Sequence, residues 1–175
     1  MKHILMIATG GTIASRETAD GLTPQLTSGE LLAEVPELEQ LCRIDTVQLM
    51  NRDSTNINSR DWLQMAACVR GHYDAYDGFV VLHGTDTMSY SASALSFMLV
   101  NLAKPVIFTG SQIPIGVLRT DGRENLITAI EIAAAHDAEG PLVPEVSLYF
   151  QNRLFRANRT VKQSAEEFAA FRSYN

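Results

Sequence analysis

Two threonines, each directly after an apolar segment, are the residues of this chain best suited to chemistry. Thr12 lies in TGGTIAS, after the apolar residues 4–7, and Thr85 lies in HGTDTM, after residues 79–82. A threonine hydroxyl is a weak nucleophile until a base takes its proton, and a lysine kept neutral by burial can be that base. Asp86, next to Thr85, can orient such a lysine or bind a substrate ammonium group. These residue types favour nucleophilic chemistry over phosphate binding.

Each motif also has an ordinary structural explanation. Gly10 and Gly11 suit a plain strand-to-helix turn or a dinucleotide loop, although the GxGxxG and GxxxxGK[ST] spacings are absent. Thr85 and Asp86 suit the N-cap of a helix. His83 is expected to be a buried, hydrogen-bonded structural histidine. The two motifs alone therefore leave catalysis and simple turn formation open.

Two further polar loops follow apolar segments. One, at residues 51–56, contains Asp53, Ser54 and Thr55, and the other, at residues 109–114, contains Ser111. Each can be a solvated turn. Four polar loops at the ends of apolar segments nevertheless exceed what solubility requires, which favours a binding site.

Alternating apolar segments and helical patterns predict how these loops are positioned. Continuous apolar runs are typical of parallel strands covered on both faces. Because the carboxyl ends of such strands meet at one edge, where open α/β sheets bind ligands, we expect a doubly wound, mostly parallel sheet with helices on both faces. The expected strands are Ile4–Ala8, Ile44–Leu49, Phe79–Leu82, Val106–Thr109 and Val146–Phe150.

Helical patterns fall between these strands. The first helix is expected to have Ser59 as its N-cap, the second to run from Met88 to Leu102, and the third from Gly122 to His136. The capping-box spacing that begins at Ser164 predicts a short helix after Lys162.

Composition narrows the class of protein. The chain has 175 residues, of which 46% are hydrophobic and 19% charged, as in one ordinary globular domain. Its net charge of −6 argues against nucleic acid and against an anionic membrane surface as partners. No run is long enough to span a membrane. The two cysteines, Cys42 and Cys68, form no CxxC pair and are expected to be free thiols, so the cytoplasm is the expected location.

Four segments together resemble the bacterial-type L-asparaginases, most closely the cytoplasmic type I branch. They are TGGTIAS near the N-terminus, HGTDTM in the middle, KPVIFTGSQIP at residues 104–114 and DGRENL at residues 121–126. The resemblance runs over essentially the whole chain. It implies an amidohydrolase that converts L-asparagine to aspartate and ammonia through a threonine acyl-enzyme, with no cofactor and no metal.

The resemblance implies a role for each matched residue. Thr12 corresponds to the usual nucleophile, and Thr85 to the threonine that activates water or serves as an alternative nucleophile. Asp86 would contact the substrate's α-ammonium group, and Lys162 aligns with the lysine that pairs with the second threonine. The remaining matched positions, which would bind substrate, are Asp53, Ser54, Thr55, Gly84 and Ser111.

The chain departs from the family pattern at two points. Leu22 stands where the family's lid carries a tyrosine that activates the first threonine. Either Thr85 with Lys162 does more of the work, or another group enters the site. The family's smaller C-terminal domain is also absent, so we expect one α/β domain over residues 1–175, as a short-chain member or a fragment.

Other functions stay open at this point. They are a glutaminase, a tRNA-linked amidotransferase subunit, and a non-catalytic amino-acid-binding domain. Because family members assemble and the open cleft must be covered, a homo-oligomer is also expected.

Overall fold

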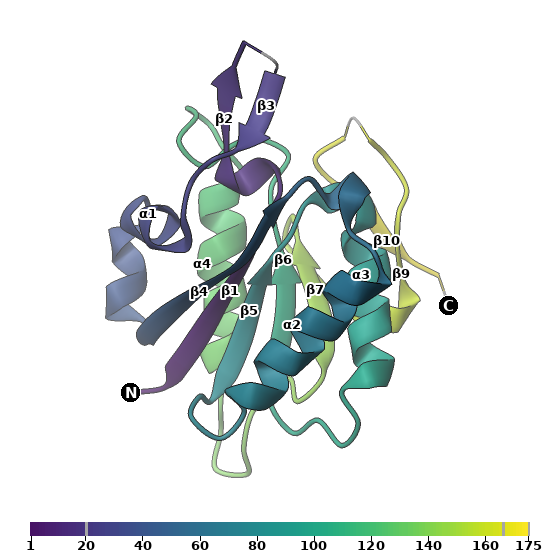
Figure 1. The fold of residues 1–175 in the computed structure, drawn as a ribbon. Coiled ribbons are helices and arrows are strands. Elements are labelled where there is room, and N and C mark those ends of the chain that lie inside the picture. Colours follow the sequence, from purple (N-terminus) through teal and green to yellow (C-terminus); the bar gives the residue numbers. More distant parts are fainter. Residues whose placement is uncertain (20, 166, 175) are drawn as a thin grey trace.

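A six-stranded sheet forms the centre of the molecule (Figure 1). The computed structural model describes residues 1–19, 21–165 and 167–174. The strand order is β4-β1-β5-β6-β7-β8, in which the first five strands are parallel and β8 is antiparallel to β7. All five strands expected from the apolar segments are confirmed. The sheet consists of β1 (His3–Gly10), β4 (Arg43–Arg52), β5 (Gly78–Leu82), β6 (Val106–Thr109), β7 (Val146–Phe150) and β8 (Arg153–Arg156).

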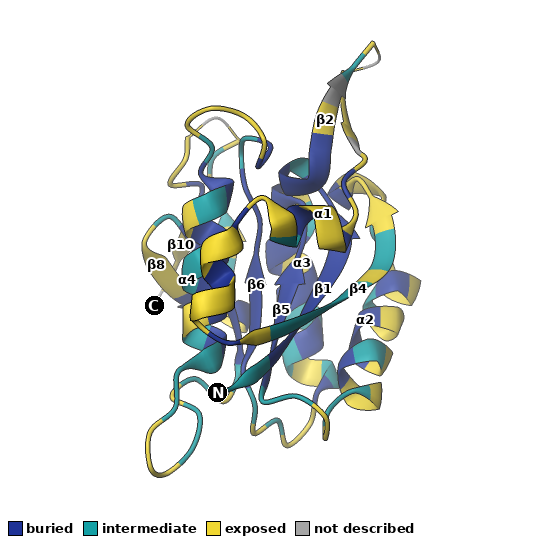
Figure 2. Cartoon of the chain, turned by 90° about the vertical axis from the view of Figure 1, so that its left-hand side faces the viewer, coloured by how far each residue is buried: buried dark blue, intermediate teal, exposed yellow. Residues whose placement is uncertain are grey.

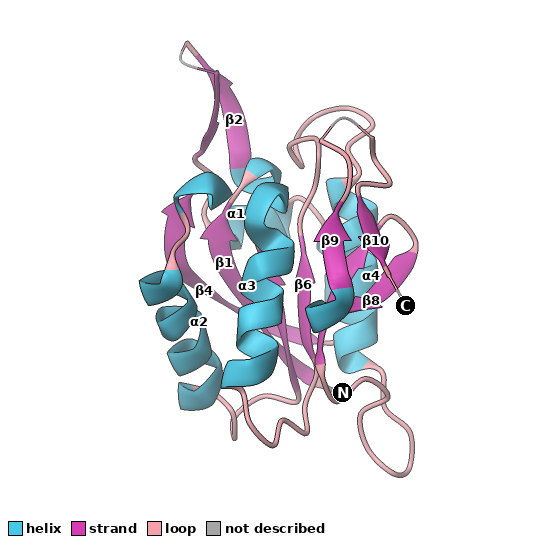
Figure 3. Ribbon diagram, turned by 90° about the vertical axis from the view of Figure 1, so that its right-hand side faces the viewer, coloured by secondary structure: helices cyan, strands magenta, loops and turns pink. Residues whose placement is uncertain are grey.

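Helices cover both faces of this sheet, as the alternating pattern predicts. On one face lie α2 (Ser59–Gly71) and α3 (Thr85–Met98), seen in front of the sheet in Figure 3. On the other lie α1 (Ser28–Ala33) and α4 (Gly122–Ala134), seen in front of it in Figure 2. The short 3₁₀ turns are η1 (Thr12–Ala14), η2 (Pro36–Gln40), η3 (Ser54–Asn56) and η4 (Ala157–Arg159).

The central strands owe their continuous apolarity to burial on both faces. Every residue of β5, β6 and β7 is buried, whereas the edge strand β4 is only partly so. Figure 2 shows the same contrast between β1, β5 and β6 on one side and β4 on the other. Among the described residues, no helix combines the length and apolarity needed to cross a membrane. Cys42 and Cys68 are free thiols, as predicted, and burial raises the pKa of Cys42 to about 11.

Three helices have boundaries that differ from those predicted, and one of them is α4, which ends at Ala134 rather than at His136. Asn58, not Ser59, caps α2, because its side chain accepts from Arg60 N while Asp61 accepts from Asn58 N in a capping box. Helix α3 begins three residues earlier than Met88, and it ends at Met98 rather than at Leu102. Asn101, with φ 57°, turns the chain away from the helix.

Two small hairpins flank the sheet and were not predicted. The pair β2 (Ser15–Thr18) and β3 (Gly21–Pro24) projects beyond the sheet in Figure 1. The pair β9 (Thr160–Lys162) and β10 (Phe171–Ser173) lies next to α3. The short helix expected after Lys162 is wrong: the capping-type bond from Glu167 N to Ser164 Oγ does form, at 3.0 Å, but the chain then returns as β10.

Candidate active site

The loops that carry Thr12 and Thr85 touch each other at the carboxyl edge of the sheet. They follow β1 and β5, which are neighbouring parallel strands. Gly11, with φ 83° and ψ 179°, adopts a conformation open essentially only to glycine. A Cβ on Gly11 would lie 2.4 Å from Gly84 Cα, so the two backbones pack without room for a side chain. The glycines of the two motifs thus bring the threonine-bearing loops together.

The loop after β4 joins them from the other side. Ser54 is buried, and a Cβ on Gly84 would lie 2.6 Å from its Oγ. Thr87 Oγ1 donates to Ser54 O at 2.7 Å, which fastens this loop to α3. Asp53 caps η3, because its Oδ1 accepts from both the amide and the hydroxyl of Thr55. Of the predicted substrate-binding residues of this loop, Ser54 therefore lies against Gly84.

Lys162 reaches the start of α3 from β9. Its Nζ donates to Thr85 Oγ1 at 2.9 Å and to Asp86 Oδ1 at 2.6 Å. The Lys162 side chain is 12% exposed, whereas that of Asp86 is 55% exposed. Charge-assisted bonds of this length are strong and directional. Gly84 occupies the N-cap, so neither Thr85 nor Asp86 has the capping role that was their ordinary alternative.

Gln112 completes the surroundings of the Thr85 hydroxyl, and sequence analysis did not single it out. Thr85 Oγ1 donates to Gln112 Oε1 at 3.2 Å, and Gln112 Nε2 donates to Glu167 O at the same distance. The hydroxyl thus accepts from Lys162 and donates to Gln112. The available sequence signal was that Gln112 directly follows Ser111 in the polar loop at residues 109–114.

A buried carboxylate shapes the loop that carries Gln112. Asp121 accepts from the backbone amides of Gln112 and Ile113 at 2.9 and 3.0 Å. Asn125 Nδ2 donates to Gly110 O at 3.0 Å. Ser111 is buried, and its hydroxyl donates to Ile113 O within the loop. Asp121 and Asn125, both within DGRENL, therefore position this loop.

Thr12 is placed differently from Thr85. It begins η1 and is half-buried, and its hydroxyl has no hydrogen-bond partner among the described residues. Leu22, on β3, lines a hollow of about 500 Å³ together with Asn51 and Asp53. Leu22, at the position where the resemblance led us to expect a tyrosine, therefore borders the same hollow as the loop that carries Asp53.

His83 is buried but only half satisfied. Its Nδ1 donates to Gly84 O at 2.7 Å, whereas Nε2 has no hydrogen-bond partner within the part of the chain that the structure describes. Burial lowers the pKa of His83 to about 4, more than the bond to Gly84 raises it. The neutral His83 ring thus donates to the Gly84 carbonyl, which fits the structural role expected for this histidine. The Nε2 atom without a hydrogen bond is the exception to that expectation.

Comparison with known proteins places this chain in a family. Residues 3–175 match the model of the asparaginase N-terminal domain. The chain is 46% identical to L-asparaginase 1 of Escherichia coli (strain K12), an alignment covering 99% of this chain and 51% of that protein.

Solved structures agree with this sequence match. L-asparaginase I from Vibrio cholerae superimposes with a TM-score of 0.89 at 44% identity, over 99% of this chain and 52% of that one. The thermostable L-asparaginase from Thermococcus kodakarensis gives 0.84 at 35% identity, over 99% and 51%. The chain therefore spans about half the length of the relatives it matches. On the family model, the identities and the fold, this chain belongs to the asparaginase family and is most similar to its type I members.

Proposed function

We propose that the chain carries the catalytic edge of an amidohydrolase that converts L-asparagine to aspartate and ammonia. The observation that carries this proposal is the contact of Lys162 with Thr85 and Asp86, at the edge where Gly11 brings in the Thr12 loop. Such a cluster offers a hydroxyl, a proton acceptor and a carboxylate within bonding distance of one another. These are the groups that acyl transfer through a threonine requires.

The reaction divides into two steps. In the first, the Thr12 hydroxyl attacks the carbon of the side-chain amide, its proton passes to the leaving nitrogen, and ammonia departs. In the second, water attacks the resulting ester, releasing aspartate and restoring the threonine. Lys162, in its neutral form, takes the proton of the Thr85 hydroxyl. The deprotonated Thr85 then activates that water or acts as a second nucleophile. Asp86 orients Lys162 and holds the substrate ammonium group.

The remaining predicted residues hold the amino acid. Asp53 and Ser54 bind its ammonium and carboxylate groups, and Thr55 keeps Asp53 in place through the two bonds to its Oδ1. Ser111 shapes the amide side of the pocket through its turn with Ile113. The backbone of Gly84, which a side chain would displace, lets substrate approach the strand ends closely.

The wider context is also part of the proposal. We propose that residues 1–175 act as a single α/β unit, in the cytoplasm, as a homo-oligomer. Support comes from the chain's acidic net charge and from its similarity to type I members of the family. No nucleic acid, membrane or cofactor takes part in this scheme.

A second function rests on Leu22. Because an aliphatic side chain cannot deprotonate Thr12, the site can instead hold an amino acid without turnover. A sensor of this kind would keep the loops of Asp53 and Ser54 but release no ammonia. Binding seen by calorimetry in the absence of ammonia release would favour it.

The experiment that tests the proposal measures kcat/KM for asparagine and glutamine on the wild-type chain, Thr12→Ala and Thr85→Ala. When the ammonium and carboxylate groups of the substrate are held in place, the extra methylene of glutamine displaces its amide. Such a displacement can lower kcat/KM by about a hundredfold. We expect a strong preference for asparagine and a large loss in both variants. Thr128→Ala is the matched control, because the Thr128 hydroxyl donates to Glu124 on the exposed side of α4. Equal rates on both amides contradict the specificity, and activity that survives both changes contradicts the site.

A further inference from the structure

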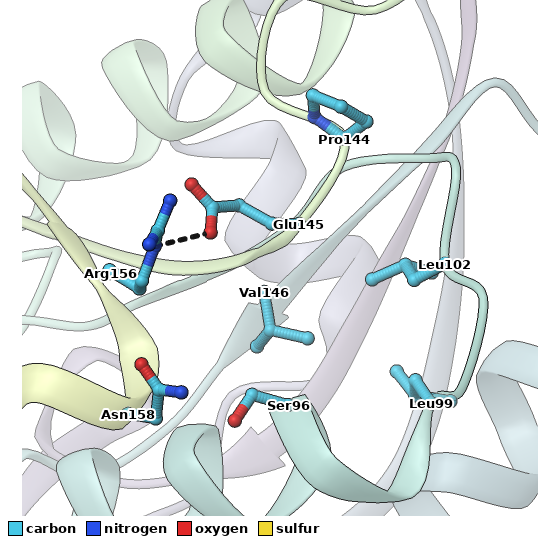
Figure 4. Close-up of a pocket in the computed structure, with 8 residues that line it drawn as sticks. All are labelled: Ser96, Leu99, Leu102, Pro144, Glu145, Val146, Arg156 and Asn158. Carbon is cyan, nitrogen blue, oxygen red and sulfur yellow. Dashed lines mark hydrogen bonds and ion pairs between the residues drawn. The ribbon is translucent and has the colours of Figure 1, made fainter.

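Hydroxyl groups along α3 differ in what they bond to. A serine or threonine within a helix commonly donates to a carbonyl three or four residues back in the same helix. Ser96 does so: near the far end of α3, beside the hollow of about 260 Å³ in Figure 4, its hydroxyl donates to Ser93 O at 2.6 Å. Thr87 does not, because its hydroxyl donates to Ser54 O, 33 residues away in the sequence. This hydroxyl therefore joins two elements instead of supporting its own helix.

A second hydroxyl on the same face of α3 makes a similar contact. Ser91 follows Thr87 by one helical turn, so the two side chains lie above one another. Ser91 is fully buried, and its Oγ accepts from Trp62 Nε1 at 2.8 Å. Trp62 lies near the start of α2, and Ser54 begins η3 just before that helix. Helix α3 therefore holds the chain from Ser54 to Trp62 at two points.

These two bonds fix different parts of the chain. At the first, Ser54 is buried and confined by two neighbours: Thr87 holds its carbonyl at 2.7 Å, and a Cβ on Gly84 would lie 2.6 Å from its Oγ. At the second, Trp62 anchors the body of α2. The Thr87 bond thus sets the place of Ser54 relative to the Thr85 loop, whereas the Ser91 bond secures α2.

The loop at residues 53–57, here called the Ser54 loop, also has hydrogen bonds of its own. Thr55 N donates to Asp53 Oδ1 at 2.8 Å, and Ile57 N donates to Ser54 O at 3.1 Å. These bonds keep the shape of the loop but do not fix its distance from α3. Loss of the Thr87 hydroxyl therefore leaves the loop folded and lets it shift as a unit.

We propose that Thr87 is a positioning residue for substrate binding, which holds the Ser54 loop at the distance from Thr85 that the amino acid requires. This inference rests on the proposed function, in which Asp53 and Ser54 hold the ammonium and carboxylate groups of the substrate. In that scheme Thr87 does not contact the substrate and acts only through the Ser54 carbonyl. Its contribution is made equally to bound substrate and transition state, so it belongs to KM more than to kcat.

The test compares Thr87→Val with the wild-type chain. Valine keeps the shape of the side chain but places a methyl group against Ser54 O. Steady-state kinetics give kcat and KM for asparagine, and calorimetry gives the dissociation constant of L-aspartate, the product. Loss of one binding contact corresponds to about a tenfold change in affinity. We expect KM and the dissociation constant to rise about tenfold, while kcat changes by less than about threefold.

Two further variants separate positioning from stability. Thr87→Ser keeps a hydroxyl and should bring both constants back to within about threefold of the wild type. Ser91→Ala is the matched control, because it removes a hydroxyl from the same face of α3 and leaves the Trp62 indole N–H without its acceptor. Its melting temperature should fall at least as far as that of Thr87→Val, yet its KM should stay near the wild-type value. Thr87→Ala is a second test variant, expected to act in the same direction as Thr87→Val.

Three results overturn the inference. They are an unchanged L-aspartate dissociation constant in Thr87→Val and Thr87→Ala, an equal rise in Ser91→Ala, and a Thr87→Ser variant that binds as weakly as Thr87→Val. Failure of the proposed function looks different: the wild type then releases no ammonia but still binds L-aspartate, and the order of the dissociation constants tests Thr87 by itself. A wild-type chain that binds no L-aspartate contradicts both proposals.

Discussion

Lys162 Nζ lies 2.9 Å from Thr85 Oγ1, although 77 residues separate them in the sequence. The contact depends on how the chain returns after β7. Gln151 and Asn152 both have positive φ and reverse the chain into β8. Turn η4 then packs against α3, and β9 delivers Lys162 beside the first turn of that helix. A late hairpin thus completes a site begun at the ends of two parallel strands.

Replacing this lysine tests its place in the reaction. Lys162→Met keeps most of the side-chain volume but removes the proton acceptor, so we expect kcat for asparagine to fall about 10²–10⁴-fold. KM should change far less, because the proposed contacts of Asp53 and Ser54 with the substrate do not involve Lys162. Lys2→Met is the control, since Lys2 pairs with Asp77 at the opposite edge of the sheet. Steady-state kinetics that show an unchanged kcat would assign the base to another group.

A buried carboxylate in the Gln112 loop gives a second prediction. Asp121→Asn turns an acceptor of two backbone amides into a group with a donor of its own, which we expect to cost about 2–3 kcal/mol of unfolding free energy. Activity should fall too, because Gln112 meets the Thr85 hydroxyl. Urea denaturation measures the first effect. Asp137→Asn is the control, since Asp137 bonds the amides of Glu139 and Gly140 in an exposed turn; equal losses in the two variants would refute the positioning role.

The central sheet could be predicted from the sequence, whereas the β7–β8 turn and the β9–β10 hairpin could not. Long apolar strands and amphipathic helices have strong periodic signals, and all five such strands are found where expected. The β7–β8 turn has Gln151 and Asn152 in place of the usual Asn-Gly, so the hairpin carried no recognisable signal. Ser164 and Glu167 do form the expected bond, yet tertiary pairing with β9 turns the following residues into a strand.

The site residues likewise divide into those that could be predicted from the sequence and those that could not. Thr12, Thr85 and Ser54 could be placed from sequence because each follows a strand, and parallel strands end at one edge. Gln112 could not, because its importance comes from a side-chain bond to Thr85 that only the folded loop creates. Asp121 was hidden for a related reason: its acceptor role depends on the path of residues 112 and 113.

Close glycine packing gives a third prediction. Gly11→Ala adds a methyl group 2.4 Å from Gly84 Cα at φ 83°, so backbone strain and overpacking act together and should cost about 2–4 kcal/mol. We expect kcat to fall as well, since the shift moves the Thr12 and Thr85 loops apart. Gly21→Ala separates the two causes: Gly21 has φ 100° but nothing within 4 Å of its Cβ position. It should lose only about 1–2 kcal/mol, and thermal unfolding that ranks the variants the other way would contradict the packing argument.

His83 makes the stability of the fold depend on pH. Burial lowers its pKa to about 4, from 6.5 for an ordinary histidine. Below pH 6.5 the His83 imidazole therefore binds a proton in the unfolded chain, whereas in the folded chain it stays neutral down to about pH 4. The stability from the neutral ring is complete above pH 6.5 and declines by about 3 kcal/mol as the pH falls to 4.

His83→Asn removes this titration while its amide can still donate to Gly84 O. We expect unfolding free energies from urea titrations at pH 7 and pH 4.5 to differ less in this variant than in the wild type. His72→Asn is the control, because His72 also contacts a backbone carbonyl, that of Cys68, from a half-buried position. Acid-sensitive carboxylates such as Asp45 and Asp77 are common to all three chains, so their effect cancels. If His83→Asn loses as much stability on acidification as the wild type, the orphaned imidazole is not the group that titrates.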